Sequence, residues 1–186
     1  TLAAGARALF APAADLSERL ELGPNQFGYR GTRDPAVCGF DFVDIGSGAL
    51  AVPALTTSVA DGNSFGPRDD ARTPLIALGG SGLRLYGQTY TSAVMSTNGY
   101  VSFSPDDTGG DFSSDCDGGY NNGAVGPQIR AFHDDLVVGE LAGAGLRYRH
   151  FPVCPRAAES RPGTAPGCHV FQWSRMQVYI DASTTS

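Results

Sequence analysis

An acidic loop holds the side chains that are best suited to binding a metal ion. The stretch SPDDTGGDFSSDCDGGYNNG places aspartates among glycines, at Asp106, Asp107, Asp111, Asp115 and Asp117. Ca²⁺ takes about six to eight oxygen ligands, commonly from carboxylates and amide oxygens of a flexible loop. The spacing is not that of an EF-hand, because the alternating acidic positions and the distal glutamate are missing. The loop is therefore a candidate Ca²⁺ site, and the alternative is a solvated acidic loop held by Cys116.

The motif FHDDL is a second candidate, because His133 precedes Asp134 and Asp135. Imidazole and carboxylate groups serve both as general bases and as metal ligands. On a strand, however, only His133 and Asp135 would share a face. The sequence contains no G-x-S-x-G nucleophile motif and no cysteine that is obviously free. We expect a structural role for the two aspartates, with a metal contribution as the alternative, and no catalytic residue.

Charge and composition exclude several classes of function. The net charge of −6 would repel phosphate backbones and anionic lipids, so we expect neither nucleic acid binding nor membrane binding. All 13 basic residues are arginines, which rules out lysine Schiff-base chemistry and a P-loop. No apolar run is long enough to span a membrane. The 25 glycines and 12 prolines indicate many turns between short strands.

Four cysteines allow three pairings. Cys154 and Cys168 flank a loop of proline, glycine and small residues, which favours a bridge between them. By remainder, Cys38 would pair with Cys116. The alternatives are four reduced cysteines or, less favoured, a zinc site, for which the usual ligand spacings are missing. Disulfides imply an oxidising compartment, and a sequence that starts without Met or a leader is expected of a mature secreted protein.

The elements that must position these residues are mostly strands. Residues 1–24 show the one helix-like pattern, so we expect a short helical or flexible N-terminal extension before a domain at 25–186. Strand patterns follow in the segments CGFDFVDIG, TPLIAL, GLRLYG, TSAVMS, YVSF, PQIRAFHDDLVV, GLRYRHFPV and CHVFQWSRMQVYI. This spacing predicts an all-β fold, a single antiparallel β-sandwich or jelly-roll-like domain.

The segment TSAVMSTNGYVSF predicts a hairpin. Asn-Gly favours a two-residue turn in which both residues have positive φ. That turn would place Val94 opposite Phe103 and Met95 opposite Ser102. The pleat would then bury Val94, Val101 and Phe103 and leave the other face, including Tyr100, exposed: Met95, Thr97, Tyr100 and Ser102.

The run LRLYGQTYTSAVMSTNGYVSF resembles a pattern in NIDO-like (nidogen extracellular) domains of bacterial secreted proteins. PQIRAFHDDL and GCHVFQW resemble later strands of the same family, and the resemblance covers about residues 75–180. It implies a module for adhesion or matrix contact and carries over no catalytic residue. Similar domains usually continue into further strands, whereas this sequence ends at YIDASTTS. We expect that those strands are supplied differently or that the sequence is part of a longer or processed polypeptide.

These observations favour a non-catalytic extracellular module for binding or assembly. Its tasks would be surface adhesion, matrix contact or a structural place in a larger complex, and the alternative is an accessory domain of a longer secreted hydrolase. An open sheet edge at 176–180 would favour a protein partner or self-assembly. Carbohydrate binding on an aromatic platform is a further hypothesis, although most aromatic residues of a β-sandwich lie in its core; the platform would consist of Tyr86, Tyr90, Tyr100, Tyr120, Phe151 and Trp173.

Overall fold

The computed structural model describes residues 23–29, 31, 42–46, 50–51, 56–57, 68–112, 126–156 and 167–179. The chain divides into two compact units, Thr1–Phe42 and Val43–Ser186. The expected N-terminal helix falls within residues 1–22, outside the described residues. The described part of the second unit is all-β, with antiparallel strand pairs and no α-helix. No described helix has the length and apolar character needed to cross a bilayer.

The strands are short, as the density of glycine and proline predicts. They are β1 (Leu50–Ala51), β2 (Thr56–Thr57), β3 (Ala71–Arg72), β4 (Ile76–Ala77), β5 (Leu83–Leu85), β6 (Gln88–Tyr90), β7 (Ser92–Met95), β8 (Tyr100–Ser102), β9 (Gln128–Arg130), β10 (Leu136–Val138), β11 (Gly145–Phe151), β12 (Cys168–Ser174) and β13 (Met176–Val178).

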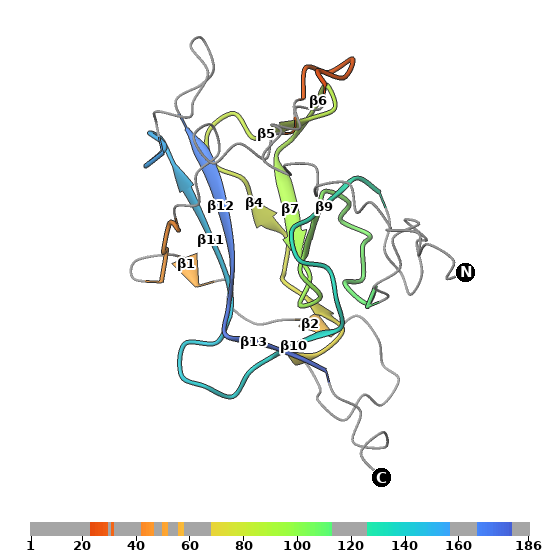
Figure 1. The fold of residues 1–186 in the computed structure, drawn as a ribbon, viewed down its shortest axis with the longest axis vertical. Helices are drawn as coiled ribbons and strands as arrows, with labels where there is room; N and C mark the ends of the chain where they lie inside the picture. The colour runs from red at the N-terminus through yellow and green to blue at the C-terminus, as the bar shows by residue number, and fades with distance from the viewer. Residues whose placement is uncertain are drawn as a thin grey trace, which may run out of the picture. The chain divides into compact units, whose positions relative to one another are not determined.

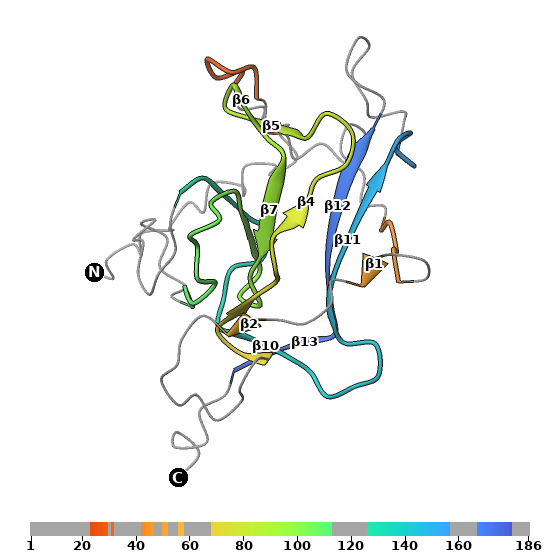
Figure 2. The same cartoon turned by 180° about the vertical axis from the view of Figure 1, so that it is seen from behind.

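Two sheets build the core of the second unit. One has the order β4-β7-β8-β9 and the other the order β1-β11-β12, with β11 and β12 as its long ribbon (Figures 1 and 2). Smaller pairs, β2-β3, β5-β6 and β10-β13, complete the described strands. Side chains from both sheets form one apolar cluster, which includes Met95 and Val101 from one sheet and Leu146 and Tyr148 from the other. This face-to-face arrangement is that of a sandwich, in agreement with the predicted fold class.

The predicted hairpin between β7 and β8 is present, but its predicted register is wrong by one residue. Met95 lies opposite Val101 and Val94 opposite Ser102. The loop therefore has three residues, and of these only Gly99 has a positive φ, 81°. A three-residue hairpin with glycine in the left-handed region is the next most common type after the two-residue turn. The shift moves Met95 to the apolar cluster and Val94 to the opposite face.

The prediction that one face of this hairpin is exposed is also wrong. Tyr100, Thr97 and Ser102 have no exposed surface. Residues 104–112 cover the face away from the apolar cluster and contact Tyr100, whereas Thr97 bonds through Oγ1 to Ala71 of β3. Ser96 Oγ donates to Gly109 O at 2.6 Å across this contact. Both faces of the hairpin are consequently buried. One face packs in the apolar cluster, and the other contacts polar groups of residues 104–112.

Two segments predicted as single strands are each divided in two. Residues 131–135 leave the strand after β9, because the amides of Ala131 and Phe132 both donate to Gly99 O at 3.2 Å. Near the end of the chain, Arg175 has a positive φ of 54° and separates β12 from β13. The uninterrupted pattern predicted that His133 and Asp135 share one face of a strand. They do not, because both lie between β9 and β10.

The strand predicted at CGFDFVDIG is absent from its described part, residues 42–46. Ile45 is fully buried, and its amide donates to Gln172 Oε1 at 2.9 Å, while Phe42 is 62% exposed. A side-chain acceptor on β12 thus takes the place of a ladder partner. The Cys154–Cys168 disulfide is present, with the two Cα atoms 5.1 Å apart. The expected partners Cys38 and Cys116 lie outside the described residues.

Candidate functional site

A buried polar network fastens residues 104–112 to β8 and β9. Asp107 stands at its centre and has no exposed surface. Its Oδ1 accepts hydrogen bonds from the Tyr100 hydroxyl at 3.0 Å and from the Gly109 amide at 2.8 Å. Its Oδ2 accepts one from Gln128 Nε2 at 2.9 Å. Burial, followed by the charge of Asp107, raises the pKa of Tyr100, so the phenol stays protonated and donates to the carboxylate.

Asp111, Arg130 and His133 continue this network. Arg130 Nη2 donates to Asp111 Oδ2 at 2.7 Å, and the Asp111 side chain is completely buried. Arg130 Nη1 lies 3.1 Å from His133 Nδ1, and His133 Nε2 lies 3.0 Å from the Asp111 carbonyl oxygen. Because a guanidinium only donates, Nδ1 must accept and Nε2 must carry the proton. His133 is therefore a neutral structural donor and acceptor, with both ring nitrogens engaged.

The described members of the candidate Ca²⁺ set do not act alike. Asp107 and Asp111 accept hydrogen bonds from protein donors, whereas the neighbouring Asp106 is exposed. Asp115 and Asp117 lie outside the described residues, so the Ca²⁺ site in this loop stays a prediction. The hydrogen bonds explain the presence of Asp107 and Asp111 in this loop. Asp107 orders Tyr100 and Gln128 of the sheet, and Asp111 pairs with the charge of Arg130.

A separate carboxylate cluster lies beside the hairpin loop. Asp69, Asp70 and Asp135 each contribute one oxygen, and the three oxygens lie within 4.8 Å of one another. Asn98 orders this region with both ends of its buried amide: Nδ2 donates to Asp70 Oδ1 at 3.0 Å, and Oδ1 accepts the Leu136 amide at 3.0 Å. Among the described residues, this is the group of side chains close enough to share a divalent cation.

The carboxylates of this cluster repel one another. Burial raises the pKa of Asp135 to about 6, and the charges of Asp69, Asp70 and Asp134 add to that effect. Asp135 and Asp134 are the two aspartates of the FHDDL motif, and the structure directs Asp135 toward a different set of partners from His133. The FHDDL motif therefore contributes to two groups of side chains: His133 belongs to the buried network, and Asp135 belongs to the carboxylate cluster.

Comparison with known proteins assigns the chain to a family. The family model described as NIDO related matches residues 51–186, which is more than half of the chain. The chain belongs to the NIDO related family. No curated protein and no solved structure matches it significantly. The family match contains the sheet β4-β7-β8-β9, strands β11 and β12 of the other sheet, the buried network and the carboxylate cluster of the NIDO-related domain.

Of the six aromatic residues named in the hypothesis of carbohydrate binding, three are used for packing within the NIDO-related domain. Tyr100 is fully buried, and Tyr90 and Trp173 pack against the apolar cluster. Trp173 also donates from Nε1 to the Ser96 carbonyl oxygen at 2.7 Å, which fixes it between the sheets. Tyr86 is 54% exposed, and Tyr120 lies outside the described residues. Tyr90, Tyr100 and Trp173 thus serve as packing residues, and carbohydrate binding stays a prediction.

Sequence reasoning missed Asp69, Asp70 and Asn98 as members of a polar site. The adjacent aspartates follow a long segment without strand pattern, and nothing local connects them to FHDDL, about 65 residues later in the chain. One signal was available, because Asn98 belongs to the Asn-Gly pair that predicts the turn. That prediction gives the Asn98 side chain no further role. Its amide instead links the hairpin to both acidic segments.

The raised pKa of Asp135 predicts a pH-dependent stability. EGTA removes any divalent cation that the carboxylate cluster could bind. Under that condition the Asp135 carboxyl group binds its proton more tightly in the folded protein than in the unfolded chain, where its pKa is 3.8. The free energy of unfolding should therefore fall as pH rises from about 4 to about 6, and the penalty persists above pH 6. Asp135→Asn should be more stable than wild type at pH 7.5, by about 1 kcal/mol or less because solvent screens this partly exposed group.

Urea titrations of both proteins in EGTA at pH 4.5 and pH 7.5 measure this effect. The advantage of Asp135→Asn should be larger at pH 7.5 than at pH 4.5. An equal difference at both pH values would show that Asp135 does not titrate between them.

Proposed function

We propose that this protein is a secreted, non-catalytic module that works by binding and assembly outside the cell. Three observations support this proposal: membership of the NIDO related family, the Cys154–Cys168 disulfide, and the structural use of both ring nitrogens of His133. A disulfide is stable in an oxidising compartment. The imidazole of His133, the one histidine of the FHDDL motif, contributes here to the hydrogen bonds that hold a loop on a sheet.

The assembly surface we propose is the outer edge of β13, and the direction of its backbone amides carries the argument. Tyr179 donates its amide to Asp135 O at 2.8 Å, toward β10. Because hydrogen-bonding direction alternates along an antiparallel strand, the amide of Val178 points away from β10. The opposite residue, Leu136, obeys the same alternation, since its amide points away from β13 and donates to Asn98.

The side chain at this edge is also suited to association. Val178 is 52% exposed, and among the described residues no strand pairs along the outer side of β13. An edge with outward amides and an apolar side chain accepts an extended segment of another chain as an added strand. We propose that a second copy of this protein supplies that segment.

Sedimentation velocity over a range of concentrations tests this proposal with two variants at one position. Val178→Pro removes the outward amide, and Val178→Ala shortens the side chain but keeps the amide. Wild type should self-associate, and Val178→Pro should weaken association by roughly 10- to 30-fold, about two backbone hydrogen bonds per symmetric interface. Val178→Ala should weaken it less.

The variants should unfold at similar denaturant concentrations, because neither alters the hydrogen bonds between β10 and β13. A wild-type protein that stays monomeric at its highest soluble concentration would overturn self-assembly through this edge. Equal association of the two variants would show that the backbone amide plays no part.

A further inference from the structure

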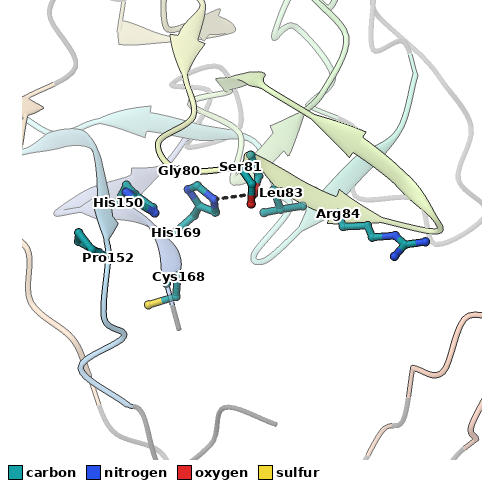
Figure 3. A pocket seen from close by; sticks show the side chains of 10 residues that line it. Gly80, Ser81, Leu83, Arg84, His150, Pro152, Cys168 and His169 are labelled. Atoms are coloured by element: carbon teal, nitrogen blue, oxygen red, sulfur yellow. Dashed lines mark hydrogen bonds between the residues drawn. The ribbon is translucent and has the colours of Figure 1, made fainter. Parts of the chain in front are cut away.

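A cavity of about 520 Å³ lies at the end of the sandwich where β5, β11 and β12 meet. The glycine-rich turn Gly80–Gly82 and β5 form one wall, and His150, Pro152, Cys168 and His169 form the other (Figure 3). Its volume falls within the usual range for small-molecule sites. The Cys154–Cys168 disulfide anchors the second wall, so part of the cavity is covalently fixed.

His169 is held in one orientation by two hydrogen bonds, and a third positions the tyrosine that makes one of them. Its Nε2 lies 3.2 Å from the Gly82 carbonyl oxygen, which can only accept, so Nε2 carries a proton. Its Nδ1 then accepts the Tyr148 hydroxyl proton at 2.9 Å, and the Gly79 amide donates to the same hydroxyl oxygen at 3.0 Å. Burial lowers the pKa of His169, with nearby His150 adding to the decrease, although the Gly82 bond opposes it.

His150 is fixed by shape rather than by hydrogen bonds. It lies directly opposite His169 in the β11-β12 register, with ring centroids 4.9 Å apart. A Cβ at Gly79 would come within 2.5 Å of the His150 ring, so the ring occupies space that only glycine leaves open. No hydrogen bond to the ring nitrogens of His150 is found within the described residues. These nitrogens are therefore available to a ligand.

Among the described residues that line the cavity, the ionisable side chains are all basic. They are Arg84, His150 and His169, and this described lining contains no aspartate or glutamate. This is notable in a chain with a net charge of −6. Figure 3 shows the two histidines together on one side and Arg84 extending from β5 on the other. An anionic group of a ligand could therefore pair with Arg84 on one side while its remaining polar groups face His150 on the other, without an opposing carboxylate among the described lining residues.

We propose that this cavity binds a small acidic saccharide, with the carboxylate at Arg84 and the sugar ring toward His150. The Gly80–Gly82 backbone and the Ser81 hydroxyl would bond the sugar hydroxyls, and Pro152 and Leu83 offer apolar surface to the ring. The fixed imidazoles lower the entropic cost of binding. The proposal deepens the binding function proposed above by naming a ligand class, and its site lies apart in sequence from the β13 edge.

NMR titration of the histidine ring signals provides the test, with D-glucuronate as the probe and D-glucose as its neutral counterpart. Glucuronate should shift the signals of His150 and His169 saturably, and glucose should leave them unchanged at equal concentration. Arg84→Gln should weaken glucuronate binding by about two- to fivefold. The effect is modest because Arg84 is exposed, so solvent would screen its ion pair with the carboxylate of glucuronate. The matched control Arg68→Gln, whose guanidinium pairs with Glu140 outside the cavity wall, should bind as wild type does.

Three results would contradict the proposal. Absence of a saturable shift would remove the cavity as a saccharide site, and equal weakening by Arg84→Gln and Arg68→Gln would reduce the effect to overall charge. Acetate binding as tightly as glucuronate would show that the sugar ring is not recognised. None of these bears on self-association, which sedimentation measures independently.

Discussion

The Gly99→Ala variant is expected to lose about 3 kcal/mol or more of its free energy of unfolding, the sum of backbone strain and steric overlap. Gly99 has a φ of 81°, where an L-residue is strained. A Cβ there would lie 1.6 Å from the Phe132 carbonyl oxygen, a backbone atom that cannot rotate away. Relief of the overlap would break the hydrogen bonds from Ala131 and Phe132 to Gly99.

Gly143→Ala separates the two contributions. Gly143 has a similar φ of 84°, but its nearest neighbour to an added Cβ is Arg147 Nη2 at 3.6 Å, an ordinary contact. This variant should therefore lose about 1–2 kcal/mol, the cost of the backbone conformation alone. Urea unfolding followed by circular dichroism measures both. Equal losses would mean that the hairpin loop moves away from Phe132 at no cost.

The same loop shows why the sequence predicted the hairpin but not its register. Asn-Gly between two apolar runs identifies a turn from local chemistry alone. The choice between two and three loop residues depends on distant partners. Asn98 accepts a hydrogen bond from β10 and donates one to the segment before β3, and the carbonyl of Gly99 accepts two from residues after β9. These contacts stabilise the three-residue loop, in which Gly99 has a positive φ and Asn98 does not.

Burial of Tyr100 could not be read from alternation for a related reason. A period-two pattern assumes that one face of the sheet meets solvent, so polar residues on that face read as exposed. Here Asp107 supplies the acceptor for the buried Tyr100, and Asp111 supplies the acceptor for the partly buried Arg130. The Cys154–Cys168 pair, by contrast, was predicted because the sequence between the two cysteines is local and short. Local chemistry was informative wherever the partner was near in sequence.

The Asp107→Ala variant is expected to be destabilised by about 3 kcal/mol or more, because two buried donors and one partly buried donor lose their acceptor at once. They are the Tyr100 hydroxyl, the Gly109 amide and the Gln128 side-chain amide. The neighbouring Asp106→Ala is the matched control, since Asp106 is exposed, and it should change stability by less than about 0.5 kcal/mol.

Measuring both variants with Ca²⁺ and with EGTA decides what Asp107 does. If its carboxylate acts through the network, the loss in Asp107→Ala is the same in both buffers, because no ion contributes to those hydrogen bonds. If it acts as a Ca²⁺ ligand, wild type is stabilised by Ca²⁺ and the difference between wild type and variant shrinks in EGTA. The geometry favours the first result, because both oxygens of Asp107 already accept hydrogen bonds from the sheet and from the loop's own backbone.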